Sequence, residues 1–217
     1  MLKIDGLTVD IGSIPILREA SLDLNNGEIV GLIGRNGAGK TTFLRALMGL
    51  LDAKAGQMAF DDVELMAVPA QRRAHLGIGY MPEDRKLVPS LTAEENIQTP
   101  VWSMNIADWE SRLAWIYKIM PEAEQFRDRP SNSLSGGQQK LVALARALMV
   151  GHKLLLLDEP SEGIAPALAQ RMGVILKDLK AEGVSILVAE SNIHHVSDLI
   201  DRMFVIERGA VAEQAMS

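Results

Sequence analysis

Gly34-Arg35-Asn36-Gly37-Ala38-Gly39-Lys40-Thr41 is the stretch of sequence that decides the fold. An apolar run over residues 29–33 precedes it, and residues 41–50 after it carry apolar side chains at helical spacing. A glycine-rich loop between a buried strand and a helix brings backbone N–H groups together around phosphate oxygens, and the helix N-terminus adds a favourable dipole. The stretch therefore predicts a phosphate-binding loop in which Lys40 reaches the β- and γ-phosphates of a nucleotide and the Thr41 hydroxyl binds Mg²⁺. The residues expected around the phosphates are Gly34, Arg35, Asn36, Gly37, Ala38, Gly39, Lys40, Thr41 and Thr42.

Strand and helix patterns alternate along the chain on both sides of this loop. Buried strands are expected over residues 29–33, 77–81, 154–157 and 185–189, and helices over 41–50, 141–150 and 167–180. Ile4, Leu7 and Val9 alternate loosely with polar neighbours, as do Leu22 and Leu24, which favours two half-exposed antiparallel strands near the N-terminus. The pattern predicts an α/β fold with a mainly parallel core and an N-terminal antiparallel β part.

Residues 93–128 interrupt this alternation, because they show no strand pattern and carry apolar side chains at helical spacing through Leu113, Ile116, Tyr117 and Met120. We predict one domain over 1–217, in which residues 93–132 form a helical subdomain inserted into a core made of residues 1–92 and 133–217. All three Trp fall in this insert. Core packing is the expected role of these aromatic side chains, with a docking surface as the alternative.

Composition limits the classes of protein that the chain can be. Its 217 residues include 22 Lys and Arg against 28 Asp and Glu, so the net charge is 22 − 28 = −6, which argues against nucleic acid as the main partner. Apolar residues make up 47% and charged residues 23%, a globular balance that excludes a disordered chain. The chain has no Cys, which excludes disulfides and thiolate metal sites. The longest aliphatic run spans only residues 154–157, far short of the roughly 18–20 apolar residues that cross a bilayer. With no secretion signal either, we expect a cytoplasmic protein that reaches a membrane only through a partner.

A second motif ends the predicted strand over residues 154–157 with two carboxylates, Asp158 and Glu159. Ligands of open α/β sheets bind at the carboxyl ends of the strands, so these side chains should lie beside the phosphate loop. We expect Asp158 to hold Mg²⁺ through water and Glu159 to orient or deprotonate the attacking water.

A third motif, Leu134-Ser135-Gly136-Gly137-Gln138-Gln139, precedes the apolar helix over residues 141–150. A capping Ser and two glycines before a helix make a second anion site, formed by Ser135, Gly136 and Gly137. One nucleotide does not need two such sites in one chain. The motif is explained if it closes over the γ-phosphate held by another subunit.

The three motifs in this order resemble the ATP-binding subunits of ABC transporters, and the resemblance covers almost the whole chain. Within that family, the chain is most similar to the shorter ATPase subunit of importers for branched-chain amino acids, urea or amides. Three segments carry this finer resemblance: residues 80–83 (YMPE), 89–96 (PSLTAEEN) and 159–166 (EPSEGIAP).

The resemblance implies a nucleotide-driven clamp with several partners. Two ATPase subunits, in a homodimer or a heterodimer, hold two ATP and Mg²⁺ between them and pass their closing motion to integral-membrane permease subunits. A substrate-binding protein takes part indirectly, and nucleic acid does not. The implied place in the cell is the cytoplasm, on the inner face of the membrane. Small polar solutes, branched-chain amino acids first, are the expected cargo.

Four positions depart from the family pattern. Glu83 stands where Gln is usual and is expected at the metal or at the attacking water. Ile11 replaces the aromatic residue that stacks on adenine, so only apolar contact with the base remains. Ala165 replaces an aspartate, and Ser191 replaces the switch histidine.

Ser191 can donate a hydrogen bond but carries no positive charge, which predicts a slow site. His194 and His195 could take over the histidine's role, although a surface pair is the simpler interpretation. Two other functions stay open: a soluble ABC-type ATPase in DNA repair or on the ribosome, and a regulatory module that binds ATP without turnover.

Overall fold

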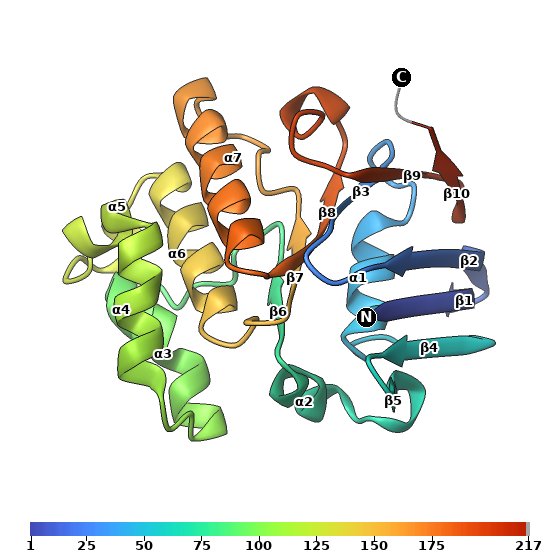
Figure 1. The fold of residues 1–217 in the computed structure, drawn as a ribbon, viewed down its shortest axis with the longest axis horizontal. Coiled ribbons are helices and arrows are strands. Elements are labelled where there is room, and N and C mark those ends of the chain that lie inside the picture. Colours follow the sequence, from blue (N-terminus) through green and yellow to red (C-terminus); the bar gives the residue numbers. More distant parts are fainter. Residues whose placement is uncertain (216–217) are drawn as a thin grey trace.

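The larger of two sheets lies in the middle of the molecule, with strands in the order β10-β9-β3-β8-β7-β6 (Figure 1). The computed structural model describes residues 1–215, except for the side chain of His195. The strands from β9 to β6 pair in parallel, and β10 pairs antiparallel with β9 at the edge. The predicted α/β class with a mainly parallel core is therefore confirmed. The bounds are β3 (Ile29–Ile33), β6 (Ile78–Met81), β7 (Leu154–Asp158), β8 (Ser185–Glu190), β9 (Arg202–Glu207) and β10 (Ala210–Gln214).

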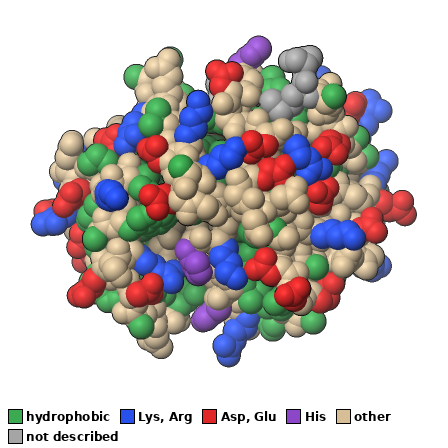
Figure 2. All heavy atoms as spheres, viewed as in Figure 1, with side chains coloured by type: hydrophobic (Ala, Val, Ile, Leu, Met, Phe, Trp, Pro, Cys, Tyr) green, Lys and Arg blue, Asp and Glu red, His purple; other side chains and the backbone are tan. Residues whose placement is uncertain are grey.

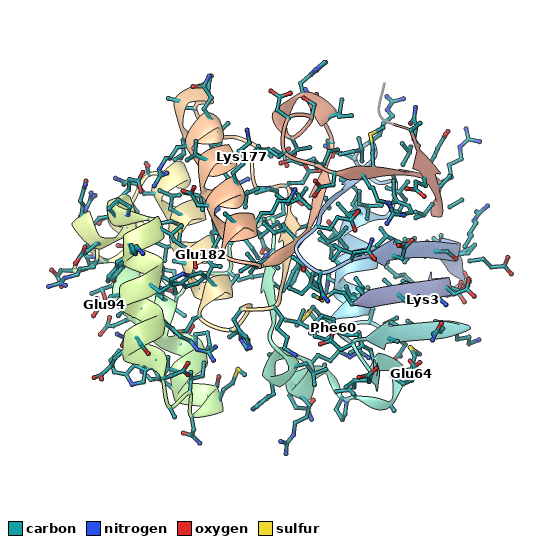
Figure 3. The ribbon with its side chains drawn as sticks, in the orientation of Figure 1. Lys3, Phe60, Glu64, Glu94, Lys177 and Glu182 are labelled. Atoms are coloured by element: carbon teal, nitrogen blue, oxygen red, sulfur yellow. The ribbon has the colours of Figure 1, made fainter. Side chains whose placement is uncertain are left out.

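The smaller sheet is antiparallel and has the order β2-β1-β4-β5. Its strands are β1 (Leu2–Ile11), β2 (Ile14–Leu24), β4 (Gln57–Phe60) and β5 (Val63–Glu64). Leu2 and Ile4 are buried, whereas Lys3 between them is exposed at the sheet surface (Figure 3). The alternation that the sequence predicts for this strand thus separates a core face from a solvent face.

The parallel sheet separates two hydrophobic cores, and successive leucines of β7 contribute to different ones. Leu155 and Leu157 belong to the core that contains α6 (Gly136–Leu148) and α7 (Pro166–Ala181). Leu154 and Leu156 belong to the core that contains α1 (Lys40–Leu47) and the smaller sheet. All four leucines have no exposed surface. Burial on both faces explains why this strand is apolar throughout instead of alternating with polar residues.

Residues 93–125 form three helices, α3 (Ala93–Met104), α4 (Trp109–Ile119) and α5 (Pro121–Gln125), which lie together at one end of the molecule (Figure 1). Thr92 and Glu95 make reciprocal hydrogen bonds that cap the start of α3. The prediction that the Trp side chains are all core is wrong for Trp102, which is 56% exposed on α3. Trp109 and Trp115 are partly buried and pack against the α6–α7 core. The proposed subdomain boundaries at residues 93 and 132 stay a prediction.

Apolar spacing alone does not locate the first residue of a helix, because a capping residue can set it several positions earlier. Apolar spacing places the start of the third-motif helix at residue 141, whereas the capping Ser that the motif predicts is confirmed, because Ser135 caps α6, which begins at Gly136. The short strands β4 and β5 and the hairpin β9–β10 were not predicted. Short helical turns complete the fold: η1 (Leu65–Ala67), α2 (Ala70–Arg73), η2 (Ala74–Leu76), η3 (Ser131–Ser133) and η4 (Ile193–His195).

Basic and acidic side chains are intermixed on the face of the molecule drawn in Figure 2. Within residues 1–215, none of the helices combines the length and the apolar character that a membrane span requires.

Candidate nucleotide-binding site

The glycine-rich loop runs from the end of β3 into α1, whose buried apolar side chains belong to the core that contains the smaller sheet. Gly34 passes so close to β9 that a Cβ atom on it would lie 2.4 Å from the backbone oxygen of Ile206. Gly39 has φ of 116° immediately before α1, a conformation that side chains with a Cβ atom rarely adopt. These two glycines are therefore required by the path of the loop, whatever the loop binds.

Lys40 points back into the loop instead of into solvent. It is 5% exposed, and its Nζ atom donates to the backbone oxygens of Gly34 at 2.6 Å and Arg35 at 3.3 Å. The same atom lies 3.0 Å from Glu159 Oε1, and it donates to Ser191 Oγ at 3.0 Å. The ammonium group is thus held inside the loop, with the Glu159 carboxylate as its counter-ion.

Asp158 ends β7 beside the first turn of α1. Thr41 Oγ1 donates to its Oδ1 atom at 3.2 Å, and the Tyr80 hydroxyl donates to Oδ2 at 3.4 Å. Burial raises the pKa of Asp158 to about 6, and the negative charge of Glu83 acts in the same direction, while the hydrogen bond from Thr41 opposes it. Burial and the neighbouring Asp158 also raise the pKa of Tyr80, which keeps that hydroxyl protonated as a donor.

Thr41, Asp158 and Glu83 line one hollow of about 560 Å³, together with Tyr80. Hydroxyl and carboxylate oxygens are the ligands that Mg²⁺ prefers. No group of three or more His, Cys, Asp or Glu side chains within residues 1–215 forms a metal cage. The usual Mg²⁺ site of nucleotide enzymes uses one or two protein groups, and substrate phosphates complete the shell. The residues present therefore fit Mg²⁺ delivered with a nucleotide.

Glu159 and Ser191 come from the ends of two neighbouring parallel strands, β7 and β8. The Ser191 backbone N–H donates to Glu159 Oε2 at 3.1 Å, and the Ser191 hydroxyl lies 2.5 Å from Oε1. That hydroxyl is also 2.6 Å from Asn36 Oδ1 in the glycine-rich loop. Since a serine hydroxyl has one proton, it donates to either Glu159 or Asn36 at a given moment. The structure thus brings the first two motifs and the predicted switch position into one cluster.

The third motif lies apart from this cluster. Ser135 accepts a hydrogen bond from Gln138 N at 3.3 Å, and Gln138 Oε1 accepts one from Ser135 N at 3.0 Å, so the pair caps α6. Ser135 and Gly136 are exposed, and none of residues 135–137 lines the hollow beside Asp158. The motif is therefore a capped helix start that faces solvent.

The remaining predicted positions are peripheral. Ile11 is 52% exposed at the end of β1, where it pairs with Ile14 of β2, itself 63% exposed. Ala165 precedes α7 and offers no side-chain cap. His194 is exposed, and the side chain of His195 lies outside the described residues.

Three polar residues of this region escaped the sequence analysis: Tyr80, Lys140 and Glu190. Glu190 ends an apolar strand just as Asp158 does, and that likeness is a signal that could have identified it. Lys140 is a single cation among the apolar positions of α6, and it is 4% exposed. Its Nζ atom donates a short hydrogen bond to the backbone oxygen of Glu159.

A glycine-rich loop between β3 and α1, with carboxylates at the ends of adjacent parallel strands, defines a P-loop nucleotide-binding protein. The family model described as ABC transporter matches residues 17–162, so the chain belongs to the ABC transporter ATP-binding family and is an ATPase subunit of a transporter.

Named relatives and solved structures agree with this assignment. The chain is 35% identical to the high-affinity branched-chain amino acid transport ATP-binding protein BraG of Pseudomonas aeruginosa, over 97% of this chain and 91% of that protein. It is 33% identical to the lipopolysaccharide export system ATP-binding protein LptB of Escherichia coli, over 89% of this chain and 81% of that protein. Its fold matches a dimeric ATP-binding cassette solved in a post-hydrolysis state with ADP and Pi, with a TM-score of 0.87 and 26% identity over 100% of this chain and 99% of the other.

Proposed function

We propose that this chain hydrolyses ATP as one of two nucleotide-binding subunits of an importer for a small polar solute, with branched-chain amino acids as the first candidates. The observation that carries the proposal is the 35% identity to BraG over nearly the full length of both chains. The segments over residues 80–83, 89–96 and 159–166 support the same importer group. The likeness to LptB makes an exporter of lipopolysaccharide the competing assignment.

The residues have separate tasks in the proposed reaction. Lys40 exchanges the Glu159 carboxylate for the β- and γ-phosphates, since its ammonium group already lies within the loop. Thr41 and Asp158 would hold Mg²⁺, and Glu83 lines the same hollow. The metal ion, when bound, neutralises the charge that develops on the phosphate oxygens.

Glu159, released from Lys40, orients the attacking water and accepts its proton. Ser191 supports this step by donating its backbone N–H to the carboxylate. Ser135 and Gly136, which are exposed, and the half-buried Gly137 contact the γ-phosphate bound by the partner subunit in a homodimer or heterodimer. In this arrangement the chain is cytoplasmic and reaches the membrane through permease subunits.

The experiment is to purify the tagged chain from native membranes, identify the polypeptides that accompany it and reconstitute the complex in vesicles. We expect integral-membrane subunits, a solute-binding protein and uptake of labelled leucine that needs ATP. The matched control is the same complex with Lys40→Ala. Purification with lipopolysaccharide-export components would replace the importer assignment. Recovery without any membrane protein would favour a soluble ATPase, and absence of phosphate release would favour a regulatory module.

A further inference from the structure

Glu159 has an unusual backbone conformation for a residue with a side chain. Its φ angle is 48°, in the left-handed region that favours glycine, and the residue is 3% exposed. Such strain persists only where the surroundings hold the residue in place. Three contacts hold the backbone here. Glu159 N donates to Ala189 O at 2.9 Å, and the Glu159 carbonyl oxygen accepts from the buried Lys140 and from Glu162 N at 3.3 Å.

The side chain of Glu159 also contacts a second buried carboxyl group, that of Glu190. Glu190 is 1% exposed at the end of β8, hydrogen-bonds the Glu159 side chain, and accepts from Ser161 N at 2.9 Å. Two carboxyl groups in contact cannot both stay ionised without strong repulsion, so the pair keeps one proton.

The surroundings place that proton on Glu190. Burial raises the pKa of Glu190 to about 8, and the hydrogen bond to Glu159 contributes to the same shift. The Glu159 carboxylate accepts from the Ser191 backbone N–H at 3.1 Å and lies 3.0 Å from Lys40 Nζ, and both contacts favour its ionised form. Glu190 is therefore a neutral donor, and Glu159 is the ionised acceptor.

We infer that Glu190 and Lys140 are positioning residues for hydrolysis: Glu190 donates to the Glu159 carboxylate, and Lys140 donates to the Glu159 carbonyl. Together they fix the direction of the carboxylate once Lys40 has turned to the phosphates. This inference rests on the proposed role of Glu159 at the attacking water. It adds two neighbours to the proposed general base Glu159: the protonated carboxyl group of Glu190, and Lys140 from α6, the helix that begins in the third motif.

Substitutions at Glu190 separate positioning from mere packing. Glu190→Gln keeps both hydrogen bonds, because an amide accepts from Ser161 N and donates to Glu159. Glu190→Ala loses both. Lys140→Met keeps most of the apolar stem of Lys140 and removes its donor. Glu110→Ala, an exposed position on α4, is the matched control.

The test measures kcat and KM for ATP, and the melting temperature, of the purified full-length chain. We expect Glu190→Ala and Lys140→Met to lower kcat about tenfold or more with KM within about threefold of wild type. Glu190→Gln should recover most of the loss. A kcat for Glu190→Ala equal to that of the control, or a Glu190→Gln variant as slow as Glu190→Ala, would overturn the inference.

The pH profile gives a second measurement that does not depend on Glu190→Ala folding. The charged groups around Glu190 are Glu159 at the end of β7 and Lys140 on α6, with Lys40 on the far side of Glu159. Ionisation of Glu190 removes the donor and sets two carboxylates against each other, so kcat should fall as pH rises through about 8. Glu190→Gln should lack this alkaline limb, and an unchanged limb in that variant would contradict the inference.

Failure of the inference and failure of the proposed function can be told apart with Glu159→Gln. Normal turnover in Glu159→Gln removes the role of Glu159 and the inference with it. Lost turnover in Glu159→Gln together with normal kcat in Glu190→Ala removes the inference alone.

Discussion

The carboxyl end of the parallel sheet, with Asp158, Glu159 and Glu190, differs from the third motif (residues 134–139) in the burial and the number of partners of its polar side chains. At the sheet end, Lys40, Asp158, Glu159 and Glu190 are all at most 5% exposed and each has hydrogen-bond or ionic partners. Ser135 and Gly136 are exposed, and their visible task is to start α6. The contrast agrees with the proposed division of the site, in which one chain supplies a preorganised half and a second subunit supplies the other half.

The largest effect should come from Glu159→Gln, which disables the preorganised half. The amide keeps the size of the side chain but cannot accept a proton, so turnover should fall roughly 10²–10⁴-fold. ATP binding should remain, and a closed dimer should accumulate with ATP, visible by size-exclusion chromatography. Turnover within about threefold of wild type would show that another group activates the water.

Mixing two inactive variants tests whether the halves meet across a dimer. Lys40→Ala removes a charge-assisted phosphate contact worth roughly 1.5–3 kcal/mol, and Ser135→Ala removes the motif's hydroxyl. Each alone should lose at least about tenfold in turnover, that is about 1.4 kcal/mol. A mixed dimer contains one site with both residues intact, so the mixture should recover activity that neither variant has. No recovery in a mixture shown to exchange subunits would place both motifs in one chain's site.

Substitutions at Ser191 test how much its side chain contributes to the preorganised half of the site. Ser191→Ala deletes the hydroxyl between Lys40, Glu159 and Asn36 but keeps the backbone N–H that donates to Glu159. One neutral hydrogen bond contributes about 0.5–1.5 kcal/mol, so kcat should fall only about threefold to tenfold. Ser191→His should raise the rate if a positive switch residue is what the site lacks. Fast hydrolysis by the wild-type chain that Ser191→Ala leaves unchanged would direct attention to Glu83 or His194.

The smallest effect is expected in the selectivity for the nucleotide base. Ile11 is half exposed and offers apolar contact without aromatic stacking, which elsewhere is worth roughly 1–3 kcal/mol. Affinities for ATP and GTP should therefore agree within about tenfold, or about 1.4 kcal/mol. Isothermal titration with both nucleotides measures this ratio, and a hundredfold preference for ATP would reveal a residue that recognises the base.

Local patterns made the longer helices, the first two motifs and six of the strands predictable from the sequence; the six strands are β1, β2, β3, β6, β7 and β8. Gly34 to Thr41 and the four leucines before Asp158 carry their structural reasons within a few residues of themselves. Glu190 does not, because its role arises only when β8 lies between β3 and β7 and brings it to Glu159. The same holds for Lys140, whose partner is 19 residues away in the sequence. Helical spacing likewise could not show that Trp102 faces solvent.

Strand β7 has a mechanical consequence that follows from its leucines. Leu154 and Leu156 pack in one core and Leu155 and Leu157 in the other, so β7 is held by close packing on both of its faces. A displacement of the helical end of the molecule acts on β7 through the core that contains α6 and α7. A displacement of the β-rich end acts on it through the core that contains α1 and the smaller sheet. Both displacements act at the C-terminal end of β7, where Asp158 and Glu159 lie. Close-packed cores are little compressible and transmit strain, so we expect a displacement at either end of the molecule to reach the carboxylates through β7.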